Sequence, residues 1–545
     1  ESVDEVFSLS LNSGISRLLP VLLPSRSWFL GRNRTLRDVV IRDVVPLIES
    51  SSYLLLTDIE YTDGDPDTYL IALSIATGEK ADAVLRDNRE GVLARVAGIS
   101  DQTTVVYSAT MDREFANIAL TAIVRRRKFK AEQGDLHGGH TRAFRKDWKR
   151  TRSNLEPSRL NIDQPSSYIR YGEDFVLKLY RRLEAGTNPD REVLEFLTEY
   201  TDFCNAPRAL GWLEYRNAFD PEAEPVTVGL LTSYTRNGTN GWKFMLDHLG
   251  LYFERALAVA PEDARLRELD FRGDIILIAA KPLPAIMADL FGTYAERVRQ
   301  LGQRLADLHK ALASRPDVSS FAPEPFTDFY RFGLYHGMLG QANRALDALR
   351  NTWRRMGGEA QKDCTVLLDR ENDVRAALHP LRDERISGMR LRIHGDFHLS
   401  QLQFTGNDVI IMNFDGDPTR SLTERRLKRS SLRDLACIIR SFHYVSYAVL
   451  FGQVPGIVAG GDAQQLEKWA DAWSTCMSGV LMKSYFDAAG DNEFLPSTQK
   501  ERRVLLQSYM IEKCLKEIMH ELEYRPSWLR IPIRGLLGIL DAKPE

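Results

Sequence analysis

The sequence predicts an α+β protein, with strands gathered in the first part of the chain and helices in the second. Residues 1–90 contain strand-length runs rich in β-branched and aromatic residues, such as RDVVIRDVVPL, separated by turn-forming clusters. Strand-like runs return over residues 160–235. From about residue 242 apolar residues recur every three to four positions, which is the spacing of amphipathic helices. We therefore expect a strand-rich part followed by a larger helical part.

Length and composition place the chain among globular proteins with several domains. At about 150 residues per domain, 545 residues correspond to roughly three to four domains or subdomains. The composition is 43% hydrophobic and 27% charged with a net charge of -3, so the bulk charge gives no indication of nucleic-acid binding. The five cysteines are scattered, odd in number and without metal-type spacing. Free, buried thiols in a reducing compartment are the plain interpretation.

We expect neither a signal peptide nor a membrane span. The apolar run near the N-terminus, RLLPVLLPSRSWFL, is broken by prolines and arginines. The longest later run, YVSYAVLFGQVPGIVAGG, contains Gln453 and Pro455. These two residues interrupt it too early for a membrane helix of about 20 residues. The protein is therefore predicted to be cytoplasmic.

The order of the patterns predicts four segments. Residues 1–90 form an N-terminal cap, 91–152 a helical and basic connector, 153–241 a strand-rich lobe, and 242–545 a helical lobe. In the connector, residues 125–152 carry eleven Lys or Arg and three acidic residues. Nucleic-acid contact is one interpretation of that charge. Because few aromatic side chains are interleaved, a solvated helix and linker is the favoured one.

The stretch IHGDFHLSQLQ in the helical lobe has the form of a loop that activates a hydroxyl for phosphoryl transfer. In protein kinases this loop reads H-R-D-x-x-x-x-N, with a metal-binding amide five residues after the aspartate. Here Gln401 follows Asp396 by five residues, and the hydrophobic strand VIIMNFDGDP comes shortly afterwards. This spacing predicts Asp396 as the base that accepts the hydroxyl proton and Gln401 as a metal ligand. Asn413 and Asp415, at the strand end, are the other predicted metal ligands.

The strand-rich lobe should supply a lysine for the nucleotide phosphates and a helical acid that orients it. Lys178 lies in the alternating run FVLKLY, and Glu192 follows at the start of the next helix. A surface lysine and an ordinary first-turn glutamate are the alternative interpretation. The chain has no G-x-x-x-x-G-K-[ST] motif, which argues against P-loop chemistry. The whole arrangement predicts a two-lobed, protein-kinase-like fold with nucleotide bound by residues 153–241 and the catalytic loop and acceptor site in residues 242–545.

Many separate stretches resemble the maltokinases, and they are especially similar to the form often fused to trehalose synthase. The similarity runs over nearly the whole chain, from about residue 19 to about residue 540. The stretches that carry it are LPSRSWFLGRNR, IEYTDGDPDTYLIAL, VLKLYRRLEAGTNPDREVLEFLTE, FAPEPFTDFY, IHGDFHLSQLQ, RSLTERRLKRSSLRDLACIIRSFHY and YRPSWLRIPIRGLL.

The resemblance implies a fold similar to that of aminoglycoside phosphotransferases, with the strand-rich cap added at the N-terminus. It implies transfer of the γ-phosphate of ATP, with Mg²⁺, to the anomeric hydroxyl of maltose, giving maltose 1-phosphate for α-glucan (glycogen) synthesis. Within it, Asp396 is the base, Gln401 a magnesium ligand and Lys178 a phosphate-binding residue. The implied partners are a small sugar and, by fusion or association, trehalose synthase, with no nucleic acid and no membrane.

The chain departs from the family pattern at positions that the resemblance places in the site. The family strand end I-D-F-E-G-E-P here reads M-N-F-D-G-D-P, so an amide, Asn413, replaces the principal metal carboxylate. Asp415 or Asp417 would then have to supply the missing charge. On the late helix the family's E-K-A-L-Y-E-x-x-Y-E keeps its lysine as Lys513 but loses both tyrosines. The resemblance places the acceptor sugar near this helix, with Lys513, Glu517 and His520 as the substrate residues. The other positions that depart from the family pattern are Asn240, Tyr168, Ser400 and Lys516.

Three functions remain open from the sequence. The first is an active kinase of maltokinase type, in which Asn413 weakens metal binding. The second is a catalytically degenerate module that binds a glucan or a partner enzyme. The third is a kinase for another sugar, because the presumed sugar-facing residues differ. Asp396, Gln401 and Lys178 favour activity. Asn413, Asn240 and Tyr168 favour degeneration.

Overall fold

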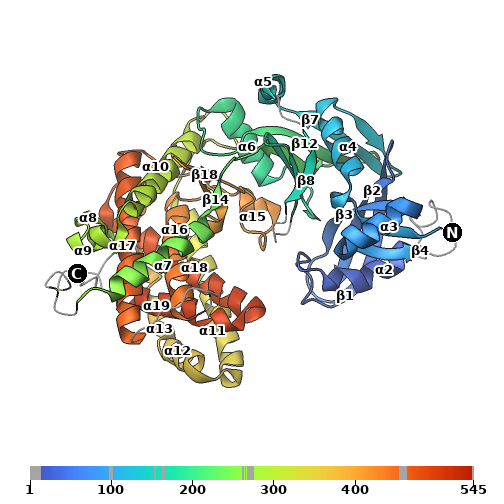
Figure 1. The fold of residues 1–545 in the computed structure, drawn as a ribbon. Helices are drawn as coiled ribbons and strands as arrows, with labels where there is room; N and C mark the ends of the chain where they lie inside the picture. Colours follow the sequence, from blue (N-terminus) through green and yellow to red (C-terminus); the bar gives the residue numbers. More distant parts are fainter. Residues whose placement is uncertain are drawn as a thin grey trace. The chain divides into compact units, whose positions relative to one another are not determined.

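The computed structural model shows a chain of helices and strands divided into two compact units (Figure 1). Unit 1 comprises Glu1–Tyr200 and Pro207–Arg236, and unit 2 comprises Thr201–Ala206 and Asn237–Glu545. Within these ranges the structure describes residues 14–96, 102–151, 155–160, 166–260, 275–452 and 463–542, together with residues 263, 266 and 454.

Unit 1 begins with an antiparallel sheet in the order β1-β2-β3-β5-β4, with β11 paired to β3. Its β-branched and aromatic side chains point alternately into a core with Leu19 and Phe29, which are fully buried. The elements are α2 (Gly14–Leu22), β1 (Leu36–Leu47), β2 (Ser52–Tyr61), β3 (Asp67–Thr77), α3 (Gly78–Asp87), β4 (Val92–Val96), β5 (Thr104–Ser108) and β11 (Arg182–Leu183). The strand-rich cap is thus present, and it extends beyond residue 90.

A second sheet of unit 1 has the order β6-β7-β12-β13-β10-β9-β8. In it β9 and β10 form the predicted hairpin, with Gly172 at a φ of 56° in the turn. The elements are α4 (Arg113–Val124), β6 (Lys128–Lys130), β7 (Gly134–His140), α5 (Arg142–Arg150), β8 (Pro157–Leu160), β9 (Ser167–Tyr171), β10 (Phe175–Leu179), α6 (Pro189–Tyr200), β12 (Ala209–Asn217) and β13 (Val226–Ser233).

The helical character expected for residues 91–152 is only partly correct. Helices α4 and α5 lie there, but β4 and β5 belong to the first sheet, and β6 and β7 belong to the second. Strand β7, with the sequence GDLHGGH, lacks the alternation of β-branched residues that marks a strand. Two of its glycines are required by close packing, because there is no room for a side chain. A Cβ at Gly138 would clash with the Ala122 carbonyl, and one at Gly139 would lie 2.5 Å from the Trp212 ring. This local packing is not visible in the sequence pattern.

Unit 2 is mainly helical, as predicted from residue 242 onward. Helices α10, α16 and α18 coincide with three of the predicted amphipathic runs, and α16 packs against both α17 and α18 (Figure 1). The helices are α7 (Gly241–Leu257), α8 (Ile275–Ala280), α9 (Ala285–Phe291), α10 (Tyr294–Ala313), α11 (Asp328–Thr352), α12 (Gly358–Asp369), α13 (Glu371–Ala376), α14 (His379–Asp383), α15 (Leu422–Arg426), α16 (Leu432–Leu450), α17 (Ala463–Ala489), α18 (Gln499–Tyr524) and α19 (Arg530–Asp541).

Short strands interrupt the helices of unit 2 and carry the predicted catalytic stretch. Strands β14 (Thr239–Asn240), β17 (Leu402–Phe404) and β18 (Val409–Ile411) form one small sheet. Strands β15 (Glu324–Pro325) and β16 (Met389–Arg390) form another. The loop between β16 and β17 contains Asp396, and the residues after β18 contain Asn413 and Asp415. The hairpin β17–β18 therefore brings these two stretches to the same end of the small sheet.

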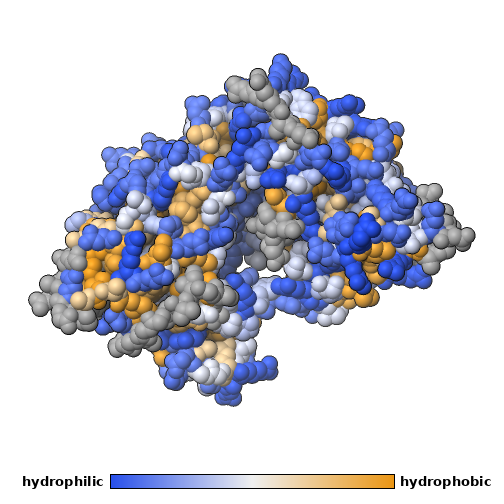
Figure 2. All heavy atoms as spheres, viewed as in Figure 1, coloured by the Kyte–Doolittle hydropathy of each residue, from blue (hydrophilic) through white to orange (hydrophobic). Residues whose placement is uncertain are grey.

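Hydrophilic side chains cover most of the face shown in Figure 2, while apolar ones gather over the α9 and α17 end of unit 2. Across the part of the chain that the structure describes, every helix is too short or too polar to cross a bilayer. All five cysteines are free thiols; four are buried, whereas Cys204 is exposed in the segment after α6. The prediction of buried thiols is thus wrong for Cys204 alone.

Candidate active site

The loop that contains Asp396 is anchored by a buried carboxylate on α16. Asp434 accepts hydrogen bonds from the backbone N–H of His394 at 2.8 Å and of Gly395 at 2.9 Å. His309 of α10 lies 3.2 Å from the same carboxylate and holds Tyr485 with its other ring nitrogen. Burial raises the pKa of Asp434, but its contacts with His309, His394 and the Gly395 N–H together outweigh burial and lower it. Asp434 therefore stays ionised and fixes the loop backbone.

The role of Asp434 as the anchor of this loop was not predicted from the sequence, although one feature of the sequence indicated it. It is a fully buried acid in the first turn of α16, a helix that is buried on almost every face. A buried carboxylate is tolerated only where several donors converge on it. The acid in the run LRDLACII could have been recognised as the anchor of a neighbouring polar loop.

Asp396 carries its charge beside two lysines and a histidine. Lys513 Nζ lies 3.3 Å from Asp396 Oδ1, and His398 Nε2 lies 3.5 Å from Oδ2. Burial by itself would raise the pKa of Asp396, but Lys513, His398 and Lys516 outweigh it and hold this pKa well below its usual value. The carboxylate is therefore ionised at neutral pH and can accept a hydrogen bond from a substrate hydroxyl.

Gln401 and Asn413, two of the predicted metal ligands, are brought together. Asn413 Nδ2 donates to Gln401 Oε1 at 2.8 Å, and Gln401 Nε2 lies 3.2 Å from His398 Nε2. A polar chain thus runs from Asn413 through Gln401 and His398 toward Asp396. Asn413 adopts the left-handed conformation, with a φ of 56°. Asparagine is one of the few residues other than glycine that favour this region.

The two acids after β18 differ in their surroundings. Asp415 is half-buried, and its backbone carbonyl accepts a hydrogen bond from Arg425 at 3.1 Å. Asp417 is 3% exposed, and its Oδ2 lies 2.5 Å from Lys516 Nζ on α18. Burial raises the pKa of Asp417, but the charge and hydrogen bond of Lys516 and the hydrogen bond from Thr419 together outweigh burial and lower it. Asp417 is thus ionised and bound to a lysine.

The donor set does not fit a magnesium ion held by protein carboxylates. Mg²⁺ prefers one or two carboxylates together with phosphates and waters. Here Gln401 and Asn413 are neutral and hydrogen-bonded to each other, and the Asp417 carboxylate is bound to Lys516. Among the described residues, no three His, Cys, Asp or Glu side chains are arranged to hold a metal. The predicted set of Gln401, Asn413 and Asp415 contributes a single carboxylate.

Of the predicted substrate residues on α18, Lys513 contacts the Asp396 carboxylate, and the other two have different surroundings. Glu517 Oε2 forms an ion pair of 2.8 Å with Arg440, a fully buried arginine of α16. His520 is exposed and packs its ring against Tyr524, with 4.9 Å between ring centroids. Burial lowers the pKa of His520, so its ring is neutral at neutral pH.

Lys178, the predicted phosphate-binding residue, is a buried lysine in unit 1. Its strand β10 lies between β9 and β13, and its side chain is only 5% exposed. This rules out the alternative of a surface lysine on an edge strand. Lys178 Nζ lies 2.8 Å from Asp190 Oδ2 at the start of α6, and Tyr180 donates to the same oxygen at 3.1 Å. Asp190 is a partner that the sequence analysis missed, two residues before Glu192.

Two of the departures from the family pattern have clear local surroundings. The Asn240 side chain accepts hydrogen bonds from the N–H groups of Trp242 and Lys243 and so caps α7. It also donates to the Ser400 carbonyl in the catalytic loop at 3.2 Å. In unit 1, Tyr168 faces Lys178 across the β9–β10 pair, 6.0 Å from the ring centroid to Nζ. Asn240 therefore supports the loop, and the Tyr168 ring lies beside the Lys178 ammonium.

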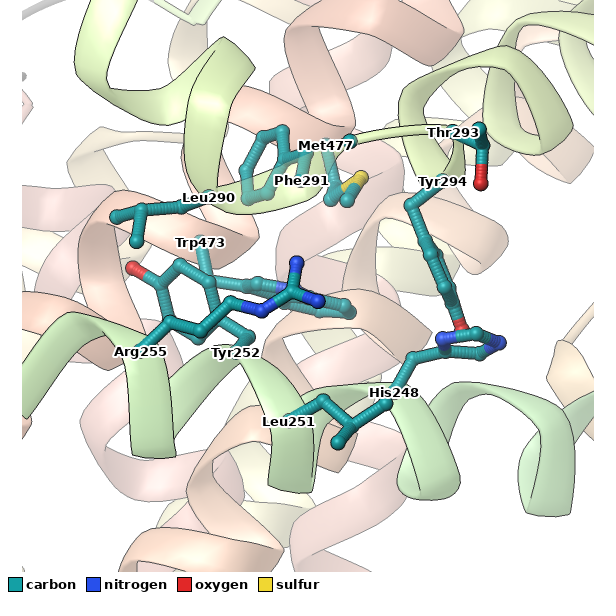
Figure 3. Close-up of a pocket in the computed structure, with 11 residues that line it drawn as sticks. His248, Leu251, Tyr252, Arg255, Leu290, Phe291, Thr293, Tyr294, Trp473 and Met477 are labelled. Carbon is teal, nitrogen blue, oxygen red and sulfur yellow. The ribbon is translucent and has the colours of Figure 1, made fainter.

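A separate cavity of about 350 Å³ lies in unit 2 among α7, α9, α17 and the start of α10. Figure 3 shows the rings of Tyr252, Phe291 and Trp473 around it, with Arg255 reaching across. None of the predicted site residues belongs to its described lining, so we do not assign it to the acceptor site. The lining residues are His248, Leu251, Tyr252, Arg255, Leu290, Phe291, Gly292, Thr293, Tyr294, Trp473 and Met477.

The segment that forms most of the first sheet of unit 1 matches a known domain family. Residues 22–112 match the maltokinase N-terminal cap domain. The match extends past residue 90 and includes β4 and β5, which pair in that sheet. The chain is also 22% identical to a glucosamine kinase from Streptacidiphilus jiangxiensis, over 70% of this chain and 73% of that protein. It is 21% identical to a glucosamine kinase from Mycolicibacterium smegmatis, over 70% of this chain and 79% of that protein.

Solved structures of glucosamine kinase share the fold. One, in complex with glucosamine, ADP and inorganic phosphate, has a TM-score of 0.55 at 15% identity, covering 96% of this chain and 98% of its own. A second, in another crystal form, has a TM-score of 0.56 at 15% identity, covering 96% of this chain and 99% of its own. These likenesses confirm the predicted class: an α+β kinase-like fold that carries a strand-rich N-terminal cap.

Proposed function

We propose that this chain, a phosphotransferase related to the maltokinase-type sugar kinases, transfers the γ-phosphate of ATP to the anomeric hydroxyl of maltose. The observation that carries the proposal is the Asp396 carboxylate. It lies on a loop fixed by Asp434, it is ionised, and Lys513 lies beside it at 3.3 Å. A carboxylate held in this way can align a sugar hydroxyl and accept its proton as the phosphoryl group is transferred.

Other residues would divide the remaining work. Lys178, held by Asp190, is proposed to bind the nucleotide phosphates, with Glu192 as a further acid at the start of α6. Lys513 would compensate the charge that develops near Asp396. Mg²⁺ would enter with the nucleotide, because the protein supplies few carboxylates for it. The predicted ligands Gln401, Asn413 and Asp415 remain proposals for that ion.

The charge of α18 favours a neutral acceptor. Lys513 and Lys516 are 16% and 26% exposed, whereas Asp417, the partner of Lys516, is 3% exposed. The accessible side of the Lys516–Asp417 pair is therefore more positive than its buried side, whereas Lys513 and Asp396 are about equally exposed, at 16% and 15%. An ammonium group would be repelled there, whereas maltose carries no charge. Glucosamine is the second candidate, and it is favoured by the two curated relatives, which are glucosamine kinases.

The finer functional context rests on the resemblance to maltokinases. We propose that the product is maltose 1-phosphate and that it enters α-glucan synthesis in the cytoplasm. Fusion to, or association with, trehalose synthase is part of the same proposal. The competing function is a non-catalytic module that keeps the kinase fold and binds a glucan or a partner enzyme.

The test is a sugar-dependent assay on the purified chain. ADP release is measured with maltose, glucosamine and glucose at saturating ATP and Mg²⁺, and the product is located by phosphorus NMR. We expect turnover with maltose and a signal for phosphate on the anomeric oxygen. Asp396→Asn is the matched control: it keeps the side-chain shape and should lower turnover by about 10²- to 10⁴-fold. If a cooperatively folded protein releases ADP with none of the sugars, maltose is rejected as the acceptor; if it also binds no Mg·ATP, the non-catalytic function is favoured.

A further inference from the structure

Two lysines on α18 point at the same polar cluster. Lys513 and Lys516 are three positions apart and so lie on the same side of the helix. Lys513 Nζ is 3.3 Å from the Asp396 carboxylate, and Lys516 Nζ is 2.5 Å from the Asp417 carboxylate. The two ammonium groups and the two acids thus form a paired set around the proposed base.

The Lys516 ammonium can donate more hydrogen bonds than its partner Asp417 accepts. An ammonium carries three N–H donors, and the single Asp417 oxygen at 2.5 Å occupies one of them. Asp417 is already satisfied on its other oxygen, which accepts from the Thr419 N–H at 3.0 Å and the Thr419 hydroxyl at 2.7 Å. Asp417 therefore acts as a fixed, buried anchor that holds Lys516 in place, while the lysine remains 26% exposed.

The strand end opposite provides one carboxylate, that of the half-buried Asp415, to hold a metal against the cluster. Asn413 and Gln401 are neutral, and they bond to each other at 2.8 Å. Phosphoryl transfer still requires positive charge near the transferred group, because its oxygens carry the developing charge. In this cluster the fixed positive charge comes from the ammonium groups of α18 and from Arg420, whose Nε lies 3.4 Å from Asp417 Oδ2.

We propose that the Lys516 ammonium, anchored by Asp417, supplies the positive charge that a carboxylate-bound metal would otherwise supply, so that unit 2 binds nucleotide phosphates without a metal held by protein carboxylates. This inference rests on the proposed phosphotransferase function and adds a residue that determines how that site neutralises phosphate. It predicts opposite effects on two ligands when Lys516 is removed. Metal-free ATP should bind more weakly, because one cation near its phosphates is lost. A divalent metal should bind more tightly, because Lys516 no longer neutralises the Asp417 carboxylate.

The experiment measures both ligands on the whole chain. ATP binding is titrated by calorimetry in EDTA and again in saturating Mg²⁺, and Mn²⁺ binding is followed by electron paramagnetic resonance. Lys516→Met is expected to weaken metal-free ATP at least tenfold and to tighten Mn²⁺ binding. Lys500→Met is the matched control, because Lys500 lies on the same helix, pairs with Glu384 and is 67% exposed. It should change neither affinity.

Two further variants protect the test against misfolding. Lys516→Arg keeps the charge and should keep metal-free ATP binding within about threefold of the native value. Lys516→Met combined with Asp417→Asn also removes the carboxylate that Lys516 paired with; it should still bind metal-free ATP weakly but should not bind Mn²⁺ more tightly. Native protein that binds ATP only with Mg²⁺, or Lys516→Met that behaves like Lys500→Met, would overturn this inference alone. Absence of ATP binding under both conditions would reject the proposed function and the inference with it.

Discussion

At the scale of single residues, we propose that Asn413 determines how strongly the site binds a metal. Its amide keeps the shape of an aspartate but donates to Gln401 at 2.8 Å instead of presenting a second charged oxygen. A neutral amide beside a phosphate-bound metal provides one charge less than a carboxylate. The left-handed conformation at this position, with a φ of 56°, is also accessible to aspartate.

We therefore expect Asn413→Asp to strengthen divalent-metal binding. The new carboxylate would accept from Gln401 after that amide turns over, and it would leave an oxygen for the ion. If metal binding limits the reaction, Mg·ATP affinity or turnover should rise roughly tenfold, about 1.4 kcal/mol. The measurements are Mn²⁺ titration and ADP release. A variant that folds cooperatively but gains neither would show that the charge at this position is not what limits the site.

Lys178 is the residue of unit 1 on which the proposed nucleotide contact depends. It is buried with its ammonium between Asp190 and the rings of Tyr168 and Tyr180. Lys178→Met, which keeps the length and apolar volume of the stem, should weaken ATP by at least tenfold and leave sugar affinity nearly unchanged. Calorimetry with each ligand separates the two effects. Equal ATP affinity in variant and native protein would assign Lys178 to the packing of the sheet instead.

At the scale of secondary-structure elements, Asn240 ends one strand and begins one helix. Read from the sequence, it counted as a lost aspartate and so as a sign of degeneration. The structure gives it two roles that an amide performs well, since its oxygen caps α7 and its nitrogen holds the Ser400 carbonyl at 3.2 Å. Only the cap would survive in an aspartate, because a carboxylate cannot donate.

This difference leads to a graded prediction at Asn240. Asn240→Ala should lower the free energy of unfolding by about 1 kcal/mol through loss of the cap. Asn240→Asp should keep the cap but place a charge against the Ser400 carbonyl, so turnover should fall while the melting temperature changes little. Thermal unfolding and ADP release measured on both variants test this. Identical behaviour of the two variants in both measurements would mean that the bond to the loop has no function.

Elements with a strong periodic signal were predictable, and those shaped by close packing were not. Helix α16 was expected over the residues where it occurs, and the β9–β10 hairpin was expected around Gly172. Strand β7 was not predicted, because its glycines are required by close contacts with α4 and Trp212 that the sequence pattern does not show. In the site, spacing alone brought Asp396, Gln401 and Asn413 together. Asp434, Asp190 and the Lys516–Asp417 pair depend on contacts between distant segments, which a single sequence does not reveal.

At the scale of the whole molecule, the domain boundaries follow the sheets. We propose that the cap ends near residue 112 instead of residue 90, because β4 and β5 complete its sheet and the family match ends there. Residues 128–140 then belong with the second sheet of unit 1, to which β6 and β7 contribute. The basic residues of the predicted connector are thereby distributed over several folded elements. This agrees with the interpretation that they lie on solvated surfaces, which was favoured over contact with nucleic acid.

Unit 2 as a whole depends on buried carboxylates whose charge the fold maintains. The pKa values of Asp396, Asp417, Asp434 and Glu512 are all lowered: burial raises each of them, and neighbouring cations more than offset it. A lowered pKa in the folded state means that the unfolded chain binds more protons over the range between the two pKa values. The stability these groups contribute is therefore present above the unfolded pKa and is lost as the pH falls through the folded one.

We accordingly expect the melting temperature to be nearly constant from pH 7 to pH 6 and to fall steadily below about pH 5, where unfolded carboxylates begin to take up protons. Differential scanning calorimetry in buffers of equal ionic strength measures this. Asp434→Asn is the informative variant: it removes one titrating group and one of the two acceptor oxygens that hold the loop backbone, so it should melt lower at pH 7 and show a smaller drop between pH 5 and pH 3. A native melting temperature that stays flat down to pH 3 would contradict the assignment of these acids as ionised anchors.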